Sequence, residues 1–320
     1  MLRPKVMALY ENANLLLKKV KLDLSVKEEE FVRQSLSTRA IPSPNLLIKA
    51  HKTINENWEF PTRLVIPATI FTATFSKIVY LGIKRCPDKG RVNYSRNSIV
   101  QDSYLKETLE EMGLKKEEVT IASVDAIKMY PSIKLATIKK AVRFFARKLT
   151  SEVKKTINLC LDLIQFGMSS TLIFFDGEYY EYHGGEREEQ GLAIGGYEST
   201  LLANLVASYL FEKAKPIFRP KIYQGIYRDD GLVIFKGKKK ASDIKDWIEK
   251  LQQTVNLAAG NQHLKFTAEI WIDGESPPTP ETEDWVQIVT KDEFPVLDIN
   301  MSWSRRGTCN LESSEIKDSN

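Results

Sequence analysis

The sequence predicts an α+β protein in which an antiparallel sheet is backed by helices, and three observations lead to this prediction. Residues 119–124 are an apolar, β-branched run typical of a buried strand. Two short apolar runs, 222–227 and 232–235, flank a polar Arg-Asp-Asp-Gly turn and indicate a hairpin. Residues 198–213 are apolar over a helical length, so this helix needs other elements to cover it.

The same signals predict the remaining elements along the chain. Before the hairpin of 170–175 and 178–182, which turns at Asp176-Gly177, three helices are expected: one at 106–114 that ends near Gly113, one that begins near Leu135 after Pro131, and one at 153–166. Toward the end of the chain, a helix at 242–255 and a strand at 264–271 are expected. Three segments are expected outside this body: an N-terminal extension of helix and loop at 1–44, an acidic, proline-rich loop at 273–284, and a polar, disordered tail at 304–320.

The composition excludes several classes of protein. With 42% hydrophobic and 10% aromatic residues, the 320-residue chain can bury a core, which excludes general disorder. Its three widely spaced cysteines exclude a disulfide scaffold, a zinc ribbon and a CxxC redox site. Its three histidines include no HExxH pair, so a histidine-rich zinc enzyme is not expected.

Charge is divided unevenly along the chain. The net charge is +4, but residues 272–320 hold eleven acidic and four basic residues, which leaves +11 on residues 1–271. A basic body favours a protein that binds a polyanion. The alternative is a solvated surface on which charge is simply uneven.

The most basic stretch lies in residues 134–155, which hold eight basic residues and one acidic residue. We expect Lys139, Arg143 and Arg147 to face the negative groups of such a polyanion, because so many cations create a strong local field. The alternative is a solvated helix face.

No segment reads as a membrane span or a signal peptide. The most apolar window, 64–83, contains Pro67 and Lys77, so a buried part of the fold is the better interpretation. We therefore expect no membrane partner and a reducing, intracellular compartment, with nucleus and cytoplasm both open.

Three carboxylates are the strongest candidates for chemistry. Asp229 and Asp230 are adjacent at the tip of the predicted hairpin, where like charges repel unless a cation lies between them. Asp125 follows a separate buried strand, and if both strands belong to one sheet, the carboxylates form an oxygen site suited to Mg²⁺. A pair of Mg²⁺ ions about 4 Å apart supports in-line phosphoryl transfer. The alternatives are a plain β-turn for Asp229-Asp230 and a helix N-cap for Asp125.

A third segment, residues 190–199, is rich in glycine and runs into the apolar helix. Gly191, Gly195 and Gly196 allow the backbone to approach a flat ligand closely. The alternative is an ordinary loop that precedes a helix.

Taken in order, residues 125–132, 190–199 and 227–230 resemble motifs A, B and C of reverse transcriptases. The separations, 190 − 125 = 65 and 229 − 190 = 39 residues, are compatible with that family. The Met-Tyr-Pro-Ser ending of the first motif is most similar to Penelope-like retroelements. Four flanking segments add support: 47–52 and 61–65 resemble parts of the fingers, 265–269 resembles motif D, and 294–298 resembles a stretch near the primer grip.

The resemblance implies a right-hand polymerase fold. Residues 45–118 would form fingers, 119–272 the palm with inserted fingers helices, and 285–303 a segment like the primer grip. Such a protein adds dNTPs to a DNA or RNA primer along an RNA (or DNA) template and uses two Mg²⁺ ions, for which Mn²⁺ can substitute.

The resemblance also implies roles for single residues. Asp125 and Asp229 would hold the two ions, with Asp230 contributing less directly. Contacts to the dNTP are implied for Tyr130 under the sugar, for Gln190 and Gly191 in the pocket, and for Arg63, Lys49 and Lys52 at the triphosphate. Contacts to template or primer are implied for Gly195, Ser199, Asn204 and Tyr227. For a polymerase, the phosphates that Lys139, Arg143 and Arg147 are expected to face are likewise those of the template or primer. Lys265 is a candidate general acid for the leaving pyrophosphate.

The sequence departs from the family pattern in two places. Ala193 and Gly196-Tyr197 replace the small and proline residues usual after motif B, so the packing of the template there is open. After Trp303 the match ends, although the family continues into a helical thumb and often a GIY-YIG endonuclease. We therefore expect fingers and palm only, as in a truncated or decayed copy of a retroelement.

Two other functions remain open. Viral RNA-dependent RNA polymerases usually have a second Asp after the first Asp of motif A and a Gly before Asp-Asp, whereas this chain has Tyr130 and Arg228. A catalytically inactive nucleic-acid-binding protein is the other alternative. The intact Asp125, Asp229 and Asp230 argue against it, whereas the expected lack of a thumb argues for it.

Overall fold

The structure is a computed structural model of the whole chain. It describes residues 7–8, 11–12, 14–16, 18, 26–27, 30, 33–34, 43–48, 62–67, 79, 115, 118–147, 151–169, 171–182, 191–196, 198–218, 221–227, 229–271, 286–289, 293–296, 299–304 and 309–313. Within this described part of the chain, no helix has the length and apolar character that crossing a membrane requires.

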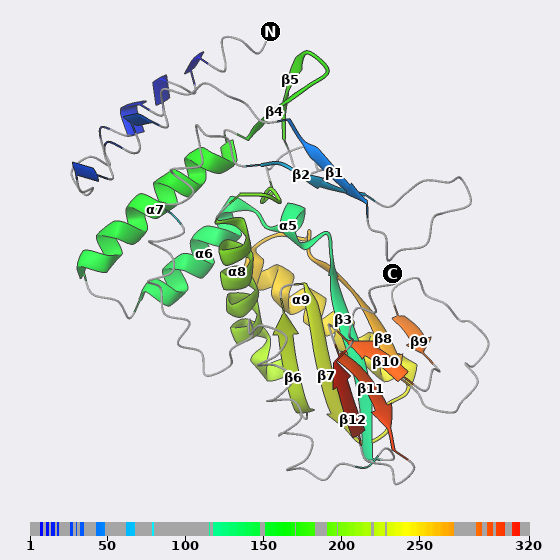
Figure 1. Cartoon of the computed structure of the whole chain (residues 1–320). Helices are drawn as coiled ribbons and strands as arrows, with labels where there is room; N and C mark the ends of the chain where they lie inside the picture. Colours follow the sequence, from blue (N-terminus) through cyan, green and yellow to red (C-terminus); the bar gives the residue numbers. More distant parts are fainter. Residues whose placement is uncertain are drawn as a thin grey trace. The chain divides into compact units, whose positions relative to one another are not determined.

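The chain forms two compact units, and each is built from two separate stretches of sequence. The first unit contains residues 1–89 and 130–206, and the second contains residues 90–129 and 207–320. Figure 1 labels the helices and strands of both units. The chain passes from the second unit to the first between Met129 and Tyr130, and back within the helix that contains Val206.

The first unit contains a short hairpin, helices and a second hairpin. Its elements are β1 (Asn45–Ile48), β2 (Thr62–Val65), α5 (Met129–Ser132, from Tyr130 on), α6 (Leu135–Ala146), α7 (Ser151–Ser169), β4 (Leu172–Phe175), β5 (Glu178–Glu181) and the start of α8 (Ser199–Ala214). Helix α6 is amphipathic and buries one stripe, which includes Ile138, Val142 and Phe145. Lys139 on its flank donates a 2.7 Å hydrogen bond to Gln165 of α7.

The second unit is built on a five-stranded sheet. Its elements are β3 (Val119–Ile127), the end of α8, η3 (Lys215–Phe218), β6 (Lys221–Tyr227), β7 (Asp230–Lys236), α9 (Ala241–Ala259), β8 (Lys265–Trp271), β9 (Val286–Val289), β10 (Glu293–Val296), β11 (Ile299–Trp303) and β12 (Cys309–Ser313). The strand order is β6-β7-β3-β8-β9, so β3 is central. Its pairs with β7 and β8 are antiparallel, and β8 pairs with β9 in parallel.

Helices cover one face of this sheet. Side chains alternate between the two faces of a strand, so Ala122, Val124 and Ala126 of β3 point to the same side. All three are buried, as are Leu251 and Val255 of α9. In Figure 1, α9 lies behind the sheet and β10–β12 lie in front of it. Asn256 fastens α9 to the start of β8, because its amide bonds both the N–H and the carbonyl of Leu264 at 3.1 and 2.9 Å.

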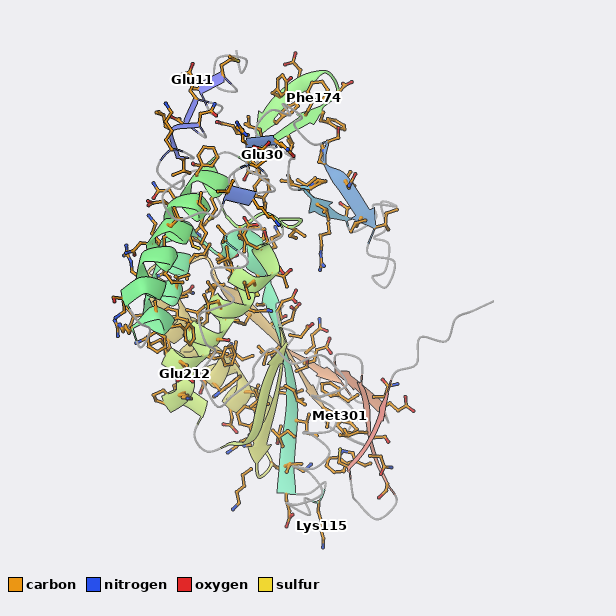
Figure 2. All side chains as sticks on the ribbon, turned by 60° about the vertical axis from the view of Figure 1, so that its left-hand side comes forward. Glu11, Glu30, Lys115, Phe174, Glu212 and Met301 are labelled. Atoms are coloured by element: carbon orange, nitrogen blue, oxygen red, sulfur yellow. The ribbon has the colours of Figure 1, made fainter. Side chains whose placement is uncertain are left out.

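A second sheet, with the order β10-β11-β12, covers part of the opposite face. Its contacts form an apolar cluster of Val119, Ile121, Leu232, Ile234, Trp271, Phe294 and Met301, against which Trp303, Cys309 and Leu311 pack. The rings of Trp271 and Phe294 are stacked with centroids 5.7 Å apart, and Trp271 and Trp303 are stacked at 5.5 Å. Met301, labelled in Figure 2, is fully buried in this cluster.

The prediction of an α+β protein with a mainly antiparallel sheet is confirmed, with β9 as the parallel exception. Every predicted strand and helix that lies among the described residues is present within a few residues of its expected bounds. The predicted helix at 106–114 and the acidic loop at 273–284 lie outside the described residues.

The polar tail differs from its prediction, because residues 309–313 form strand β12. This strand pairs antiparallel with β11, with Cys309 opposite Trp303 and Leu311 opposite Met301. Two apolar residues at alternate positions, Cys309 and Leu311, are enough to hold this strand against the fold, because the cluster already offers an apolar surface for them. Cys309 and Cys160 are both free thiols.

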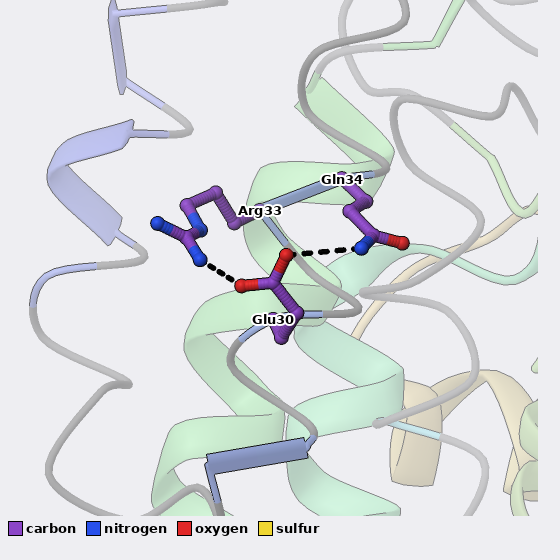
Figure 3. A network of polar contacts seen from close by, with 3 residues as sticks. All are labelled: Glu30, Arg33 and Gln34. Carbon is purple, nitrogen blue, oxygen red and sulfur yellow. Dashed lines mark hydrogen bonds and ion pairs between the residues drawn. The ribbon is translucent and has the colours of Figure 1, made fainter.

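Few residues of the N-terminal extension are described, and three of them form a polar contact network (Figure 3). Glu30 accepts a hydrogen bond from Gln34 at 2.9 Å and is also bonded to Arg33. Spacings of three and four residues are those of neighbours on one helix face, as expected for this segment.

Candidate active site

The sheet register brings two of the three candidate carboxylates directly opposite each other. Asp125 of β3 pairs with Asp230 of β7. The N–H of Ala126 donates a 2.9 Å hydrogen bond to the carbonyl of Asp229, which fixes the hairpin tip against β3. Asp229 therefore lies just before β7, and Asp230 is its first residue. All three aspartates belong to the second unit and are half-buried.

Asp125 and Asp230 share the face of the sheet that β10–β12 cover only in part. By alternation, Asp125 points to the same side as Ile121, which lies in the apolar cluster. Thr267 of β8 pairs with Asp125 on its other side. This face is therefore apolar at one end, where the second sheet covers it, and polar at the other end, where the carboxylates lie.

The donor chemistry of this polar end fits a hard divalent cation. Directly opposed residues of an antiparallel pair have Cβ atoms roughly 4.5–5.5 Å apart, so both carboxylates can reach one ion. Carboxylate oxygens are the ligands that Mg²⁺ prefers. Among the described residues, however, no three His, Cys, Asp or Glu side chains are already grouped closely enough to hold a metal ion.

Asp229 differs from the other two carboxylates in its surroundings. It lies at the edge of an apolar cavity on the helix side of the sheet, lined by Val124, Ala126, Leu210, Phe211, Val255 and Phe266. The cavity belongs wholly to the second unit. The two adjacent aspartates of the hairpin thus have different neighbours, one at the apolar cavity and one opposite Asp125.

Strand β8 adds two charged residues to the same face. Lys265 is exposed and pairs with Ile127, two residues beyond Asp125. Glu269 is exposed and pairs with Ser123, two residues before it. The sequence reasoning did not single out Glu269 as a site residue, although its spacing of two and four residues from Thr267 and Lys265 is the period of one strand face.

In the first unit, the segment that contains Tyr130 is bonded to the glycine-rich segment. The N–H of Leu192 donates to the carbonyls of Tyr130 and Ile133 at 3.0 and 3.1 Å. Lys134 forms a β-bridge with Gly191, and its own side chain is only 2% exposed. A Cβ on Gly191 would lie 2.0 Å from the carbonyl oxygen of Pro131, so only glycine fits there.

The hydroxyl group of Tyr130 also reaches the following helix. It donates a long, 3.5 Å hydrogen bond to the side-chain oxygen of Thr200, the second residue of α8. The Tyr130 backbone is thus held by Leu192 and its ring by Thr200. The sequence reasoning missed Thr200, and only its position next to Ser199 could have drawn attention to it.

The other residues predicted around motif B lie in three different settings. Gly195 has a φ of +119° and contacts the chain after β2. Ser199, the first residue of α8, is 3% exposed and bonds through its N–H to the carbonyl of Gly196. The side-chain oxygen of Asn204 is buried and has no hydrogen-bond partner in the part of the chain that the structure describes.

Arg63 lies on β2, opposite Leu47 of β1, and is exposed. The same hairpin exposes Leu46, Leu47 and Ile48, each more than half accessible. Lys49, Lys52, Gln190, Tyr197 and Arg228 lie outside the described residues. For Tyr227 only the backbone is described, at the end of β6.

The basic helix α6 exposes a slightly different set of cations from the predicted one. Arg143 and Arg147 are exposed, as predicted, and Arg147 lies 5.8 Å from the centre of the Phe144 ring. Lys139 is half-buried and bonded to Gln165. Lys140 is exposed instead, and its spacing of three and seven residues from the two arginines places it on their stripe.

No protein-family model matches the sequence, and no curated protein matches it. The structure is nevertheless similar to solved telomerase structures from two Candida species. Apo telomerase from Candida tropicalis, truncated from its C-terminal domain, is 11% identical with a TM-score of 0.52, over 85% of this chain and 54% of that one. Telomerase from Candida tropicalis in complex with a TWJ fragment of telomeric RNA is 10% identical with a TM-score of 0.56, over 87% and 45%.

The telomerase from Candida albicans, in complex with the same kind of RNA fragment, is 10% identical with a TM-score of 0.51, over 86% of this chain and 47% of that one. At such identities the likeness concerns the fold alone. The chain spans about half the length of the telomerase chains that it matches. It has a reverse transcriptase-like fold.

Proposed function

We propose that this chain is a template-directed nucleotidyltransferase of the reverse transcriptase kind. It would extend a DNA or RNA primer with dNTPs along an RNA or DNA template. One observation carries the proposal: Asp125 and Asp230 lie directly opposite each other on adjacent strands, at the polar end of a sheet in a reverse transcriptase-like fold. The motif endings that resemble Penelope-like elements support a retroelement enzyme within this kind.

In this proposal Asp125, Asp229 and Asp230 hold two Mg²⁺ ions, or Mn²⁺ in their place. When bound, the ions would neutralise phosphate charge and stabilise the attacking and leaving oxygens. The aspartates themselves do no covalent chemistry, because their role is to place charge. The primer 3′-hydroxyl attacks the α-phosphorus of the dNTP, and pyrophosphate leaves.

Other residues of the chain would bind and orient the nucleotide. Arg63 suits the triphosphate because its planar guanidinium donates two parallel hydrogen bonds to phosphate oxygens. Lys49 and Lys52 would add positive charge there. Tyr130 would lie under the sugar and exclude a 2′-hydroxyl, and Gly191, with Gln190 beside it, would line the pocket.

Lys265 would protonate the leaving pyrophosphate. Its place on the same sheet face as Asp125, two residue pairs beyond it, supports this role. Ser199, Asn204 and Tyr227 would contact the template or primer, as would the exposed cations of α6. The telomerase structures with an RNA fragment support a nucleic-acid partner for this fold.

Primer extension by the purified chain tests the proposal. We expect incorporation of dNTPs on an RNA template with Mg²⁺, lost by at least 100-fold in Asp125→Ala and Asp229→Ala. The matched control is Asp246→Ala, which removes an exposed carboxylate from α9 in the same unit.

A preference for NTPs over dNTPs would instead identify an RNA-dependent RNA polymerase. Nucleic-acid binding that survives Asp125→Ala, with no extension under Mg²⁺ or Mn²⁺, would identify a binding protein without polymerase activity.

A further inference from the structure

Residues 191–196, which we call the glycine loop, contact two predicted nucleotide-binding segments at once. At its start, Gly191 lies against the segment of Tyr130, so closely that a Cβ would fall 2.0 Å from the Pro131 carbonyl oxygen. At its end, Gly195 lies against the chain that follows β2. All these residues belong to the first unit.

The contact at Gly195 excludes every other residue. A Cβ at Gly195 would lie 2.3 Å from the carbonyl oxygen of Ile66 and 3.1 Å from a methyl group of Val65. The φ of +119° at Gly195 is strained for any residue with a side chain. One residue earlier, the carbonyl of Ile194 accepts a 2.7 Å hydrogen bond from the N–H of Ile66. Ile66 itself is 4% exposed, so this junction is buried.

The junction lies three residues after Arg63. Strand β2 ends at Val65, and Ile66 follows it directly. Because β2 is paired with β1 along its whole length, a shift of Ile66 away from the glycine loop would carry the backbone of β2 with it. The backbone of Arg63 is therefore linked to that of Tyr130 through Ile66, Gly195 and Gly191.

We propose that Gly195 is a positioning residue for Arg63, and that the glycine loop fixes the spacing between the triphosphate contact of Arg63 and the sugar contact of Tyr130. This inference rests on the proposed function, because it assumes that Arg63 binds the triphosphate. It assigns Gly195 a role through β2 in place of the template contact that the sequence resemblance implies.

The chain offers a matched control for substitution of Gly195. Gly177, in the turn between β4 and β5, has a φ of +79°, but a Cβ there would meet no atom within 4 Å. Gly177→Ala therefore imposes left-handed backbone strain without a collision. Gly195→Ala imposes a strained φ together with the collision with Ile66.

The first measurement concerns the contact and does not need activity. Hydrogen exchange of the peptide that contains Ile66 should speed up in Gly195→Ala and stay unchanged in Gly177→Ala, because only the former breaks the bond between Ile66 and Ile194. Unchanged exchange in Gly195→Ala would overturn the proposal. This result is readable even if the wild-type chain extends no primer, which would contradict the proposed function alone.

The second measurement is a double-mutant cycle in primer extension. Gly195→Ala and Arg63→Ala should each raise the KM for dNTP at least ten-fold with a smaller change in kcat. The double variant should be no more than about two-fold worse than Arg63→Ala, because residues that act through one contact are not additive. Effects that multiply, or a Gly195→Ala enzyme that matches Gly177→Ala, would overturn the proposal.

A third measurement covers the case in which Gly195→Ala does not fold. In the wild-type chain, binding of a dNTP should slow exchange of the Ile66 peptide further, since ligand at Arg63 holds β2 against the glycine loop. The same dNTP should leave this exchange unchanged in Arg63→Ala. Equal protection in both proteins would overturn the proposal.

Discussion

At the scale of single residues, the catalytic role proposed for the pair of Asp125 and Asp230 would come at a cost in stability. The two carboxylates are direct cross-strand neighbours in a half-buried position. Like charges placed directly opposite in a sheet are destabilising, and cross-strand pairs in general contribute roughly 0.2–1 kcal/mol. A site of this kind is expected where binding of a cation is more important than the stability of the empty protein.

We therefore predict that Asp125→Asn stabilises the protein when divalent cations are removed with EDTA. The free energy of unfolding should rise by about 0.5 kcal/mol, because the repulsion with Asp230 is lost. Excess Mg²⁺ should raise the melting temperature of the wild type and have a smaller effect on the variant, because only a protein that binds the ion in its folded state gains stability from it. Thermal unfolding with and without Mg²⁺ measures both effects.

Asp246→Asn is the control for this prediction, since it removes an exposed carboxylate from α9 and leaves the pair intact. Its melting temperature should respond to Mg²⁺ as that of the wild type does. An equal response to Mg²⁺ in Asp125→Asn would contradict the prediction.

The sequence singled out three candidate carboxylates but could not predict how they are arranged. The apolar runs around Asp229-Asp230 and before Asp125 were enough to predict the strands themselves, but not that they belong to one sheet. Which aspartate lies opposite Asp125 depends on the register between β3 and β7, and a shift of one residue exchanges the faces. Thr200 and Glu269 were not predicted either, because each is drawn into the site only by a contact across the fold. Thr200 accepts a hydrogen bond from Tyr130, and Glu269 pairs with Ser123 on the strand of Asp125.

At the scale of elements, helix α6 shows how packing selects among the basic residues that the sequence offers. The helix buries Ile138, Ala141, Val142 and Phe145, which leaves Lys140, Arg143 and Arg147 on the exposed stripe. Lys139 lies at the border and is bonded to Gln165 of α7. The helical period predicted this face, whereas the bond of Lys139 depends on where α7 packs.

We predict that the triple variant Lys140→Glu, Arg143→Glu, Arg147→Glu binds nucleic acid more weakly and with less dependence on salt. Each lost phosphate contact lowers the slope of log affinity against log salt by about 0.9 on duplex and about 0.7 on single strands, so three contacts lower it by roughly 2–3. Binding titrations on one nucleic acid at several salt concentrations give the slope.

Three exposed lysines outside α6 provide a control with the same change in net charge. They are Lys236, Lys238 and Lys250 in the second unit. Reversal of these three should change the slope much less, because they lie outside the proposed phosphate contacts. If both triple variants lowered the slope equally, net charge and not α6 would govern binding.

At the scale of the whole molecule, the order of the strands in the sheet could not be predicted from the sequence. The chain order of the strands differs from the sheet order β6-β7-β3-β8-β9, and each compact unit combines two distant stretches of chain. Periodicity predicts single elements, but the pairing of β3 with β7 and β8 depends on packing between residues more than 100 positions apart. The resemblance to polymerases, and not periodicity, predicted that Asp125 and the hairpin meet.

The second sheet of the second unit also depends on such distant packing. Strand β12 is polar and short, and it is ordered by two side chains, Cys309 and Leu311, that pack on the cluster around Trp271. Because Cys309 packs on this cluster, its environment reports on whether the outer sheet is closed over the cluster.

We predict that Cys309 makes the stability of the protein fall at alkaline pH. Burial raises the pKa of its thiol from 9.0 to about 12. In the unfolded chain the thiol ionises near pH 9, so unfolding releases a proton between pH 9 and about 12, and the folded state loses stability as the pH rises through this range. The loss is at most about 1.4 kcal/mol per pH unit.

Cys309→Ala lacks this contribution, so its stability relative to the wild type should improve above pH 9. Urea unfolding of both proteins at pH 8, 9 and 10 measures the difference, in which other titrating groups cancel. A constant difference over this range would mean that the thiol is open to water, and hence that β12 does not close over the cluster in solution.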